Sequence, residues 1–212
     1  GAVPHTENMP KLAFKRNGEM IAMYRVEMED ARSKYAGQVR YTQSFDGGRT
    51  WTAAQPLVQD TASYSQSFFD ITGLPDGEAA AIWLDSRTQT GDDGSTLYYA
   101  ATGAGKGFTN ERPIAQSTCQ CCRTELYVDA GGGVHAAFRD IINDSIRDMV
   151  HMVSEDGGRS FTQPVRISAD NWVIRGCPHT GPTMAKNRYG LHFAWFTMGN
   201  GAGVFYCRSD DN

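Results

Sequence analysis

The stretch Ser44-Phe45-Asp46-Gly47-Gly48-Arg49-Thr50-Trp51 decides the fold, because it returns as Ser154-Glu155-Asp156-Gly157-Gly158-Arg159-Ser160-Phe161. A degenerate copy occupies 101–108, and a fragment of a fourth copy occupies 209–212. The copies begin 57, 53 and 55 positions apart. A nearly constant period of this length indicates one supersecondary unit repeated along the chain.

The chemistry of the repeat is that of a tight turn. The Asp carboxylate accepts hydrogen bonds from turn N–H groups, and the Gly pair supplies backbone angles with φ > 0. The motif resembles the Asp-box of sialidase-like β-propellers, in which these turns lie on the face away from the ligand. The resemblance implies that Asp46 and Asp156 are structural rather than catalytic.

The resemblance also implies an all-β propeller. Short runs rich in aromatic and β-branched residues, such as Glu19–Arg25 and Ala79–Leu84, alternate with turn signals, and no helical period is present. We expect about four blades of a six-bladed ring, completed by another chain or a missing segment. The expected blade boundaries are 11–61, 62–116, 117–168 and 169–212.

Composition excludes several classes of protein. The net charge is −4 with no basic run, which argues against nucleic acid as a partner. No segment approaches the ~18 apolar residues of a membrane span. The chain opens without a signal peptide, and Gly1 is typical of a trimmed terminus, so we expect a secreted or periplasmic protein. Five cysteines are an odd number, which leaves one thiol outside any set of disulfides.

The cysteines recur in register between two units. When the units are aligned on their inner-strand apolar residues, Cys119-Gln120-Cys121 matches Cys177-Pro178-His179. Residues i and i+2 share a face of an extended segment, and inner strands meet near the propeller axis. Cys119, Cys121, Cys177 and His179 are therefore predicted to converge at the channel mouth as a tetrahedral Zn²⁺ site or a Cu(I) site.

Weaker ligands and an alternative accompany this prediction. His5 and Glu7 occupy matching positions in the first unit, and Cys122 is a weaker ligand because consecutive Cys121 and Cys122 should face opposite ways in a strand. The alternative is a disulfide that joins Cys177 to one of the three cysteines of the third unit. The sequence does not decide between the metal and the disulfide.

A second recurrence places arginines at the ends of equivalent strands. Arg25 and Arg139 lie at the ends of two such strands, and Arg87 lies just beyond the end of a third strand. Sialidases hold a substrate carboxylate with three arginines, so the resemblance makes Arg25, Arg87 and Arg139, together with Asp140, candidate ligand-binding residues. Ion pairing between blades through Asp85 and Asp140 is the favoured alternative, because the sialidase Phe/Tyr-Arg-Ile/Leu-Pro element is absent.

Three functions follow from these patterns. The leading hypothesis is an exported propeller that binds a metal ion or small ligand at the channel mouth. The alternatives are a sialidase-like glycoside hydrolase and a non-catalytic carbohydrate- or protein-binding propeller. No catalytic residue can be assigned, because fold does not imply function.

Overall fold

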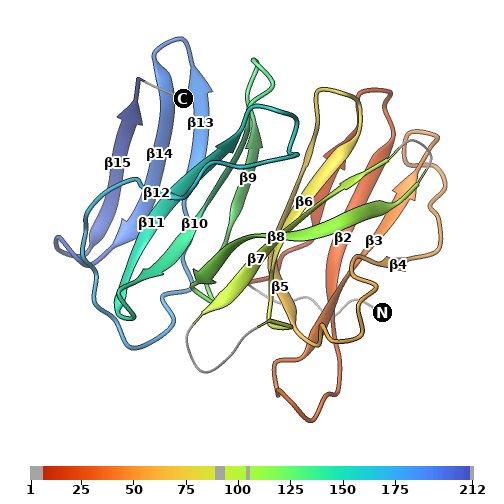
Figure 1. The fold of residues 1–212 in the computed structure, drawn as a ribbon. Helices are drawn as coiled ribbons and strands as arrows, with labels where there is room; N and C mark the ends of the chain where they lie inside the picture. The colour runs from red at the N-terminus through yellow and green to blue at the C-terminus, as the bar shows by residue number, and fades with distance from the viewer. Residues whose placement is uncertain (1–6, 89–93, 104–105, 211–212) are drawn as a thin grey trace.

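The computed structural model describes residues 7–88, 94–103 and 106–210. These residues form fifteen β-strands and no helix (Figure 1). The strands are β1 Lys11–Phe14, β2 Met20–Glu27, β3 Gly37–Ser44, β4 Gln55–Pro56, β5 Gln66–Gly73, β6 Ala79–Asp85, β7 Ser95–Thr102, β8 Phe108–Thr118, β9 Glu125–Val128, β10 Val134–Ile142, β11 Ile146–Ser154, β12 Val165–Arg166, β13 Thr183–Asn187, β14 Gly190–Thr197 and β15 Gly203–Ser209.

The strands pair in sequence order within each repeat. The first sheet has the order β1-β2-β3-β4 and the last has β13-β14-β15. The pairings are antiparallel, and in β2–β3, for example, they run in unbroken register from Met20↔Ser44 to Glu27↔Gly37. The strands predicted from the short apolar runs are confirmed, with ends that differ by a few residues.

The second and third repeats share one eight-stranded sheet, which the sequence did not predict. The long strand β8 reaches β10, where Thr118 pairs with Asp140. The backbone N–H of Cys119 then donates to the carbonyl of Arg139, 2.8 Å away. This contact fixes the segment that follows β8 against the end of β10.

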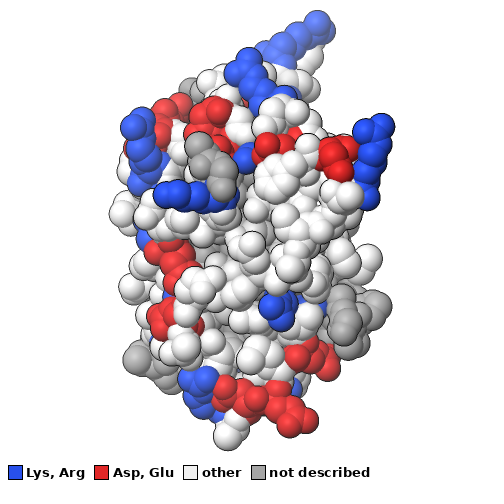
Figure 2. All heavy atoms as spheres, turned by 90° about the vertical axis from the view of Figure 1, so that its right-hand side faces the viewer, with Lys and Arg blue, Asp and Glu red and all other residues white. Residues whose placement is uncertain are grey.

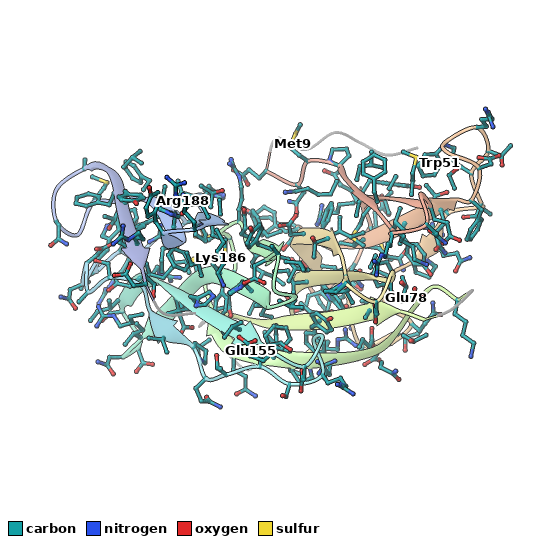
Figure 3. The ribbon with its side chains drawn as sticks, turned by 90° about the horizontal axis from the view of Figure 1, so that it is seen from above. Met9, Trp51, Glu78, Glu155, Lys186 and Arg188 are labelled. Carbon is teal, nitrogen blue, oxygen red and sulfur yellow. The ribbon has the colours of Figure 1, made fainter. Side chains whose placement is uncertain are left out.

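The core lies between consecutive repeats. Strand β6 is buried along its whole length because it packs on both faces, whereas β14 alternates between buried and half-buried residues. Three apolar clusters fill the gaps, centred on side chains such as Trp83, Phe138 and Phe193. Ion pairs add to these contacts: Glu78 lies 3.0 Å from Lys15 of the first repeat, and Lys186 pairs with Asp129 (Figure 3).

The two full copies of the repeated turn have the same hydrogen bonds. Asp46 Oδ1 accepts from the N–H groups of Arg49 and Thr50, both at 2.9 Å. Asp156 Oδ1 accepts from the equivalent N–H groups of Arg159 and Ser160, at 2.8 and 2.9 Å. Hydrogen bonding from the residue four positions on lowers the pKa of both carboxyls. These carboxylates are engaged in holding their turns.

The outer faces of the first and last sheets are open. Phe14 is 61% exposed in β1, and Val204 is 78% exposed in β15. Figure 2 shows the side of the first sheet, where uncharged surface separates two charged margins. Within the described ranges, no strand pairing joins the last sheet to the first, and no helix is long and apolar enough to cross a membrane.

Candidate functional site

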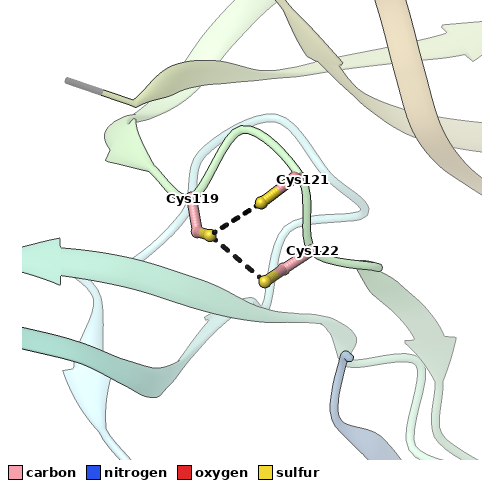
Figure 4. Close-up of side chains that lie close together, drawn as sticks. All are labelled: Cys119, Cys121 and Cys122. Atoms are coloured by element: carbon pink, nitrogen blue, oxygen red, sulfur yellow. Dashed lines mark hydrogen bonds between the residues drawn. The ribbon is translucent and has the colours of Figure 1, made fainter. Parts of the chain in front are cut away.

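Three cysteines converge in the loop between β8 and β9. The chain turns tightly there, because the N–H of Cys122 donates to the carbonyl of Cys119 at 3.3 Å. The sulfur of Cys119 lies 3.7 Å from that of Cys121 and 3.1 Å from that of Cys122 (Figure 4). All three side chains are buried, and their sulfur atoms lie within 4.8 Å of one another. We call Cys119, Cys121 and Cys122 the thiol cluster.

The thiol cluster corrects one prediction about the cysteines. Cys121 and Cys122 were expected to face opposite ways, as consecutive residues do in a strand. Residues 120–122 form a turn instead, and the turn directs both thiols toward Cys119. Cys122 is therefore a full member of the cluster.

Positive charge borders the cluster. Arg147 Nη1 donates to the sulfur of Cys119 at 3.3 Å. Hydrogen bonding from Cys121 and Cys122, with the charge of Arg147 in addition, lowers the pKa of the Cys119 thiol. Hydrogen bonding to Cys119 raises the pKa of Cys121 and raises that of Cys122 to about 12. The arrangement favours one thiolate on Cys119, stabilised by two neutral thiols.

The fourth repeat contributes one predicted residue to the edge of the cluster. The exposed Cys177 side chain interacts with the Cys121 thiol, but Cys177 is not among the three mutually close sulfurs. His179 is directed elsewhere: its Nδ1 lies 2.9 Å from a carboxylate oxygen of Glu7. Glu7, which the sequence offered as a weaker metal ligand, is thus the neighbour of His179, while His5 lies outside the described residues.

The alternative disulfide is not formed. All five cysteines are free in the structure. Cys207, which lies in β15 away from the cluster, packs against the apolar core beside Phe193.

Arg25 and Arg87 are both bound by protein groups. Arg25 donates to the carbonyls of Gln66 and Tyr35 at 2.8 and 2.6 Å, and burial lowers its pKa. Arg87 donates to Asp85 at 2.8 Å and to Glu111 at 2.6 Å. Burial opposes the charge of Arg87, but the hydrogen bonds to Glu111 and Asp85 raise its pKa overall. These contacts favour the structural alternative for both arginines.

Arg139 and Asp140 lie beside the thiol cluster. The fully buried Arg139 donates to the carbonyls of Arg147 and Phe196, at 2.6 and 2.9 Å, and stacks 4.9 Å from the ring of Trp172. Asp140 is half-buried, and its Oδ1 has no hydrogen-bond partner. Burial raises the pKa of Asp140 to about 6. The predicted ion pair between Asp140 and an arginine is not observed among the described contacts.

A separate hollow lies where the inner strands β1, β5, β9 and β13 meet. Its volume is about 410 Å³, and its lining residues are Glu7, Asn8, Met9, Lys11, Phe68, Phe69, Arg123, Thr124, Glu125, Gly181, Pro182 and Thr183. Lys11 pairs with Asp70 at 3.1 Å. Burial, followed by the nearby charge of Asp70, raises the pKa of Glu125. The raised pKa favours the protonated form of the Glu125 carboxyl beside the Asp70 carboxylate.

Sequence reasoning missed the residues of this hollow, although a signal was present. Lys11, Asp70 and Glu125 each stand one position before the apolar residue on which the units were aligned. A charged residue recurring at the same place in three inner strands indicates a polar channel wall.

Comparison with known proteins identifies the fold. No protein-family model matches the chain, and no curated protein matches it. Among solved structures, the Hadza microbial sialidase Hz136 is similar over 96% of this chain and 44% of its own, with 14% identity and a TM-score of 0.67. The Trypanosoma rangeli sialidase is similar over 97% and 37%, with 15% identity and a TM-score of 0.65.

A third similar structure is a glycosidase of another specificity. The GH93 α-L-arabinofuranosidase of Fusarium graminearum matches 98% of this chain and 65% of its own, with 15% identity and a TM-score of 0.64. The chain therefore spans less than half the length of the two sialidases. Likeness at this identity shows the fold: an all-β, sialidase-like β-propeller whose open sheets correspond to part of a ring.

Proposed function

We propose that the protein binds a soft metal ion through the thiolates of Cys119, Cys121 and Cys122. The observation that carries the proposal is the convergence of three buried sulfurs in the loop between β8 and β9. Thiolates are preferred ligands of Zn²⁺ and Cu(I), whereas Mg²⁺ and Ca²⁺ prefer oxygen. The bordering guanidinium of Arg147 partly neutralises the charge of a three-thiolate site.

The spacing of the sulfurs is close to that of a metal site. In a tetrahedral Zn²⁺ site with bonds of about 2.3 Å, the sulfur atoms lie ~3.8 Å apart. The 3.7 Å separation of Cys119 and Cys121 already fits, and Cys122 must move away from Cys119 from its present 3.1 Å. We propose Cys177, whose side chain interacts with the Cys121 thiol, as the candidate for a fourth sulfur.

The test is titration of the reduced protein with Co²⁺ and then Zn²⁺. Thiolate ligands give Co²⁺ a sulfur-to-metal charge-transfer band in the near ultraviolet, and Zn²⁺ should abolish that band at one equivalent per chain. Cys119→Ser should lose the band, while Cys207→Ser, the matched control outside the cluster, should retain it. A wild-type protein with neither the band nor retained metal would overturn the proposal. Competition with a chromophoric Cu(I) chelator then shows which ion binds more tightly.

A second candidate function is carbohydrate binding in the hollow between the inner strands. The observation that favours it is a hollow of about 410 Å³ lined by Glu125 and Lys11, in which Glu125 feels the charge of Asp70, the ion-pair partner of Lys11. Glycoside hydrolysis requires two neighbouring carboxyl groups, one to act as an acid and one as a nucleophile or base. The similar structures include sialidases and an arabinofuranosidase in complex with arabinobiose.

This candidate is tested by calorimetric titration with arabinobiose and sialic acid, followed by assays with fluorogenic arabinofuranosides and sialosides. Binding should be lost in Glu125→Gln and retained in Glu155→Gln, which changes an exposed carboxylate outside the hollow. Binding without turnover would support a non-catalytic lectin-like role. No binding to any of these sugars would contradict the candidate.

The broader assignments complete the proposal. We infer an exported protein whose repeated turns are Asp-boxes and whose blades divide at 11–61, 62–116, 117–168 and 169–212. A carboxylate-binding role for Arg25, Arg87, Arg139 and Asp140 belongs to the sialidase-like alternative, and their present partners weigh against it.

A further inference from the structure

The thiol cluster contains a C-x-x-C pair in addition to its three-fold convergence. Cys119 and Cys122 are the closest two sulfurs, 3.1 Å apart, compared with 3.7 Å for Cys119 and Cys121. The turn that brings them together is closed by the hydrogen bond from the N–H of Cys122 to the carbonyl of Cys119. A disulfide has a bond of about 2.05 Å, so an approach of about 1 Å would join them.

A fixed positive charge contacts one sulfur of the pair. Arg147 Nη1 lies 3.3 Å from Cys119 Sγ, and Arg147 Nε is held by the carbonyl of Ile174 at 3.2 Å. The guanidinium of arginine remains protonated in proteins. A cation beside a cysteine favours the thiolate, which is the nucleophile in disulfide exchange. Cys119 is therefore the attacking sulfur and Cys122 the resolving one.

We propose that Cys119 and Cys122 form a redox-active dithiol, which closes to a disulfide by exchange with a low-molecular-weight disulfide. The Cys119 thiolate attacks one sulfur of the external disulfide, forming a mixed disulfide and expelling one external thiolate. The deprotonated Cys122 then attacks the Cys119 sulfur and expels the second external thiolate. Two protein thiols are oxidised, one external disulfide is reduced to two thiols, and the two protons pass to solvent or to the released thiolates.

The proposal does not depend on metal binding, although it has a consequence for it. The disulfide would withdraw two of the three sulfurs of the proposed metal site. The protein would then hold a thiophilic ion only in its reduced state.

Burial determines the expected kinetics. Cys119 and Cys122 are fully buried, whereas Cys177 is exposed. Cys177 should react first with the external disulfide and remain a mixed disulfide. Closure of the pair requires opening of the loop, so its rate should level off as the external disulfide concentration rises.

The experiment uses the full chain, reduced and freed of metal with a chelator. The protein is incubated with oxidised glutathione, quenched with acid, alkylated and digested with trypsin without reductant. Peptide 107–123 holds Cys119, Cys121 and Cys122, because trypsin does not cut between Arg112 and Pro113, and peptide 176–186 holds Cys177. In Cys121→Ser, peptide 107–123 should lack both alkyl groups and be lighter by two hydrogen atoms than the unalkylated reduced peptide.

Matched variants identify the pair. Cys122→Ser should lose the closed form and accumulate glutathione on peptide 107–123 instead. Cys207→Ser and Cys177→Ser should still close, and dithiothreitol should reverse closure in each. Thermal unfolding of each variant shows whether it is folded before the reaction.

Three results would overturn the inference. The first is that both thiols of peptide 107–123 stay free in folded Cys121→Ser while Cys177 is modified. The second is that peptide 107–123 of the wild-type protein is linked to peptide 176–186 in place of closing internally. The third is that closure persists in Cys122→Ser. Closure without Co²⁺ or Zn²⁺ binding would support the inference and overturn the proposed metal site, and metal binding without closure would do the reverse.

Discussion

Replacing Asp140 by Asn should stabilise the protein at neutral pH and leave it unchanged in acid. The carboxyl is half-buried at the junction of β10 with β8, its Oδ1 has no hydrogen-bond partner, and burial raises its pKa to about 6. The unfolded chain has the ordinary value, about 3.9. Because the folded state binds the proton more tightly, the contribution is fully favourable below about pH 4 and is lost as pH rises through 6.

The magnitude follows from the shift in pKa. A shift of about two pH units corresponds to ~3 kcal/mol at 1.36 kcal/mol per unit, and partial exposure reduces the expected gain to about 1–2 kcal/mol. Asn keeps the shape and removes the charge, so Asp140→Asn should raise the free energy of unfolding by that amount at pH 7.5.

The assay is urea denaturation of wild type and Asp140→Asn at pH 7.5 and pH 4. Asp148→Asn is the matched control, because Asp148 is fully buried but accepts from Arg166 and from the N–H groups of Asn171 and Trp172. The Asp148→Asn substitution should lower the free energy of unfolding at neutral pH, because it weakens these hydrogen bonds. Equal effects of Asp140→Asn at both pH values, or a loss of stability at pH 7.5, would refute the reasoning.

Three further predictions concern the core, a buried histidine and a turn. Phe138→Ala should cost about 3–5 kcal/mol in urea denaturation, because it empties a fully buried site between the second and third repeats. Burial lowers the pKa of His151 to about 4, so stability should fall as pH drops from about 6.5 to 4, and His151→Gln should flatten that slope in thermal scans. Gly158→Ala should lower Tm more than Gly157→Ala: both have positive φ, but only the Gly158 methyl meets the Tyr99 hydroxyl.

The strands could be predicted from the sequence because their signals are local. Alternating apolar residues between turns gave β2, β3 and β14 within a few residues of their ends. The joining of the second and third repeats could not be predicted in this way. It depends on the pairing of Thr118 with Asp140 and on the hydrogen bond from the Cys119 N–H to the Arg139 carbonyl, which join residues of different strands that no local pattern relates.

The candidate site was predicted in part, for the same physical reason. Cys119 and Cys121, which the match with Cys177 singled out, lie together in the thiol cluster, whereas Cys177 is not one of its three mutually close sulfurs. The predicted orientation of Cys122 was wrong because a turn replaces the assumed extended segment. The C-x-x-C spacing of Cys119 and Cys122 was the sequence feature that could have indicated this turn. The pairing of His179 with Glu7 joins the first and fourth repeats, and no local pattern indicates which partner the imidazole takes.

The measurement that tests the central claim most directly is X-ray absorption at the zinc edge of the zinc-loaded protein. The claim predicts a shell of three or four sulfur atoms at about 2.3 Å, and fewer sulfurs in Cys122→Ser. A shell of only nitrogen and oxygen at about 2.0–2.1 Å, or zinc lost during desalting, would contradict binding by Cys119, Cys121 and Cys122.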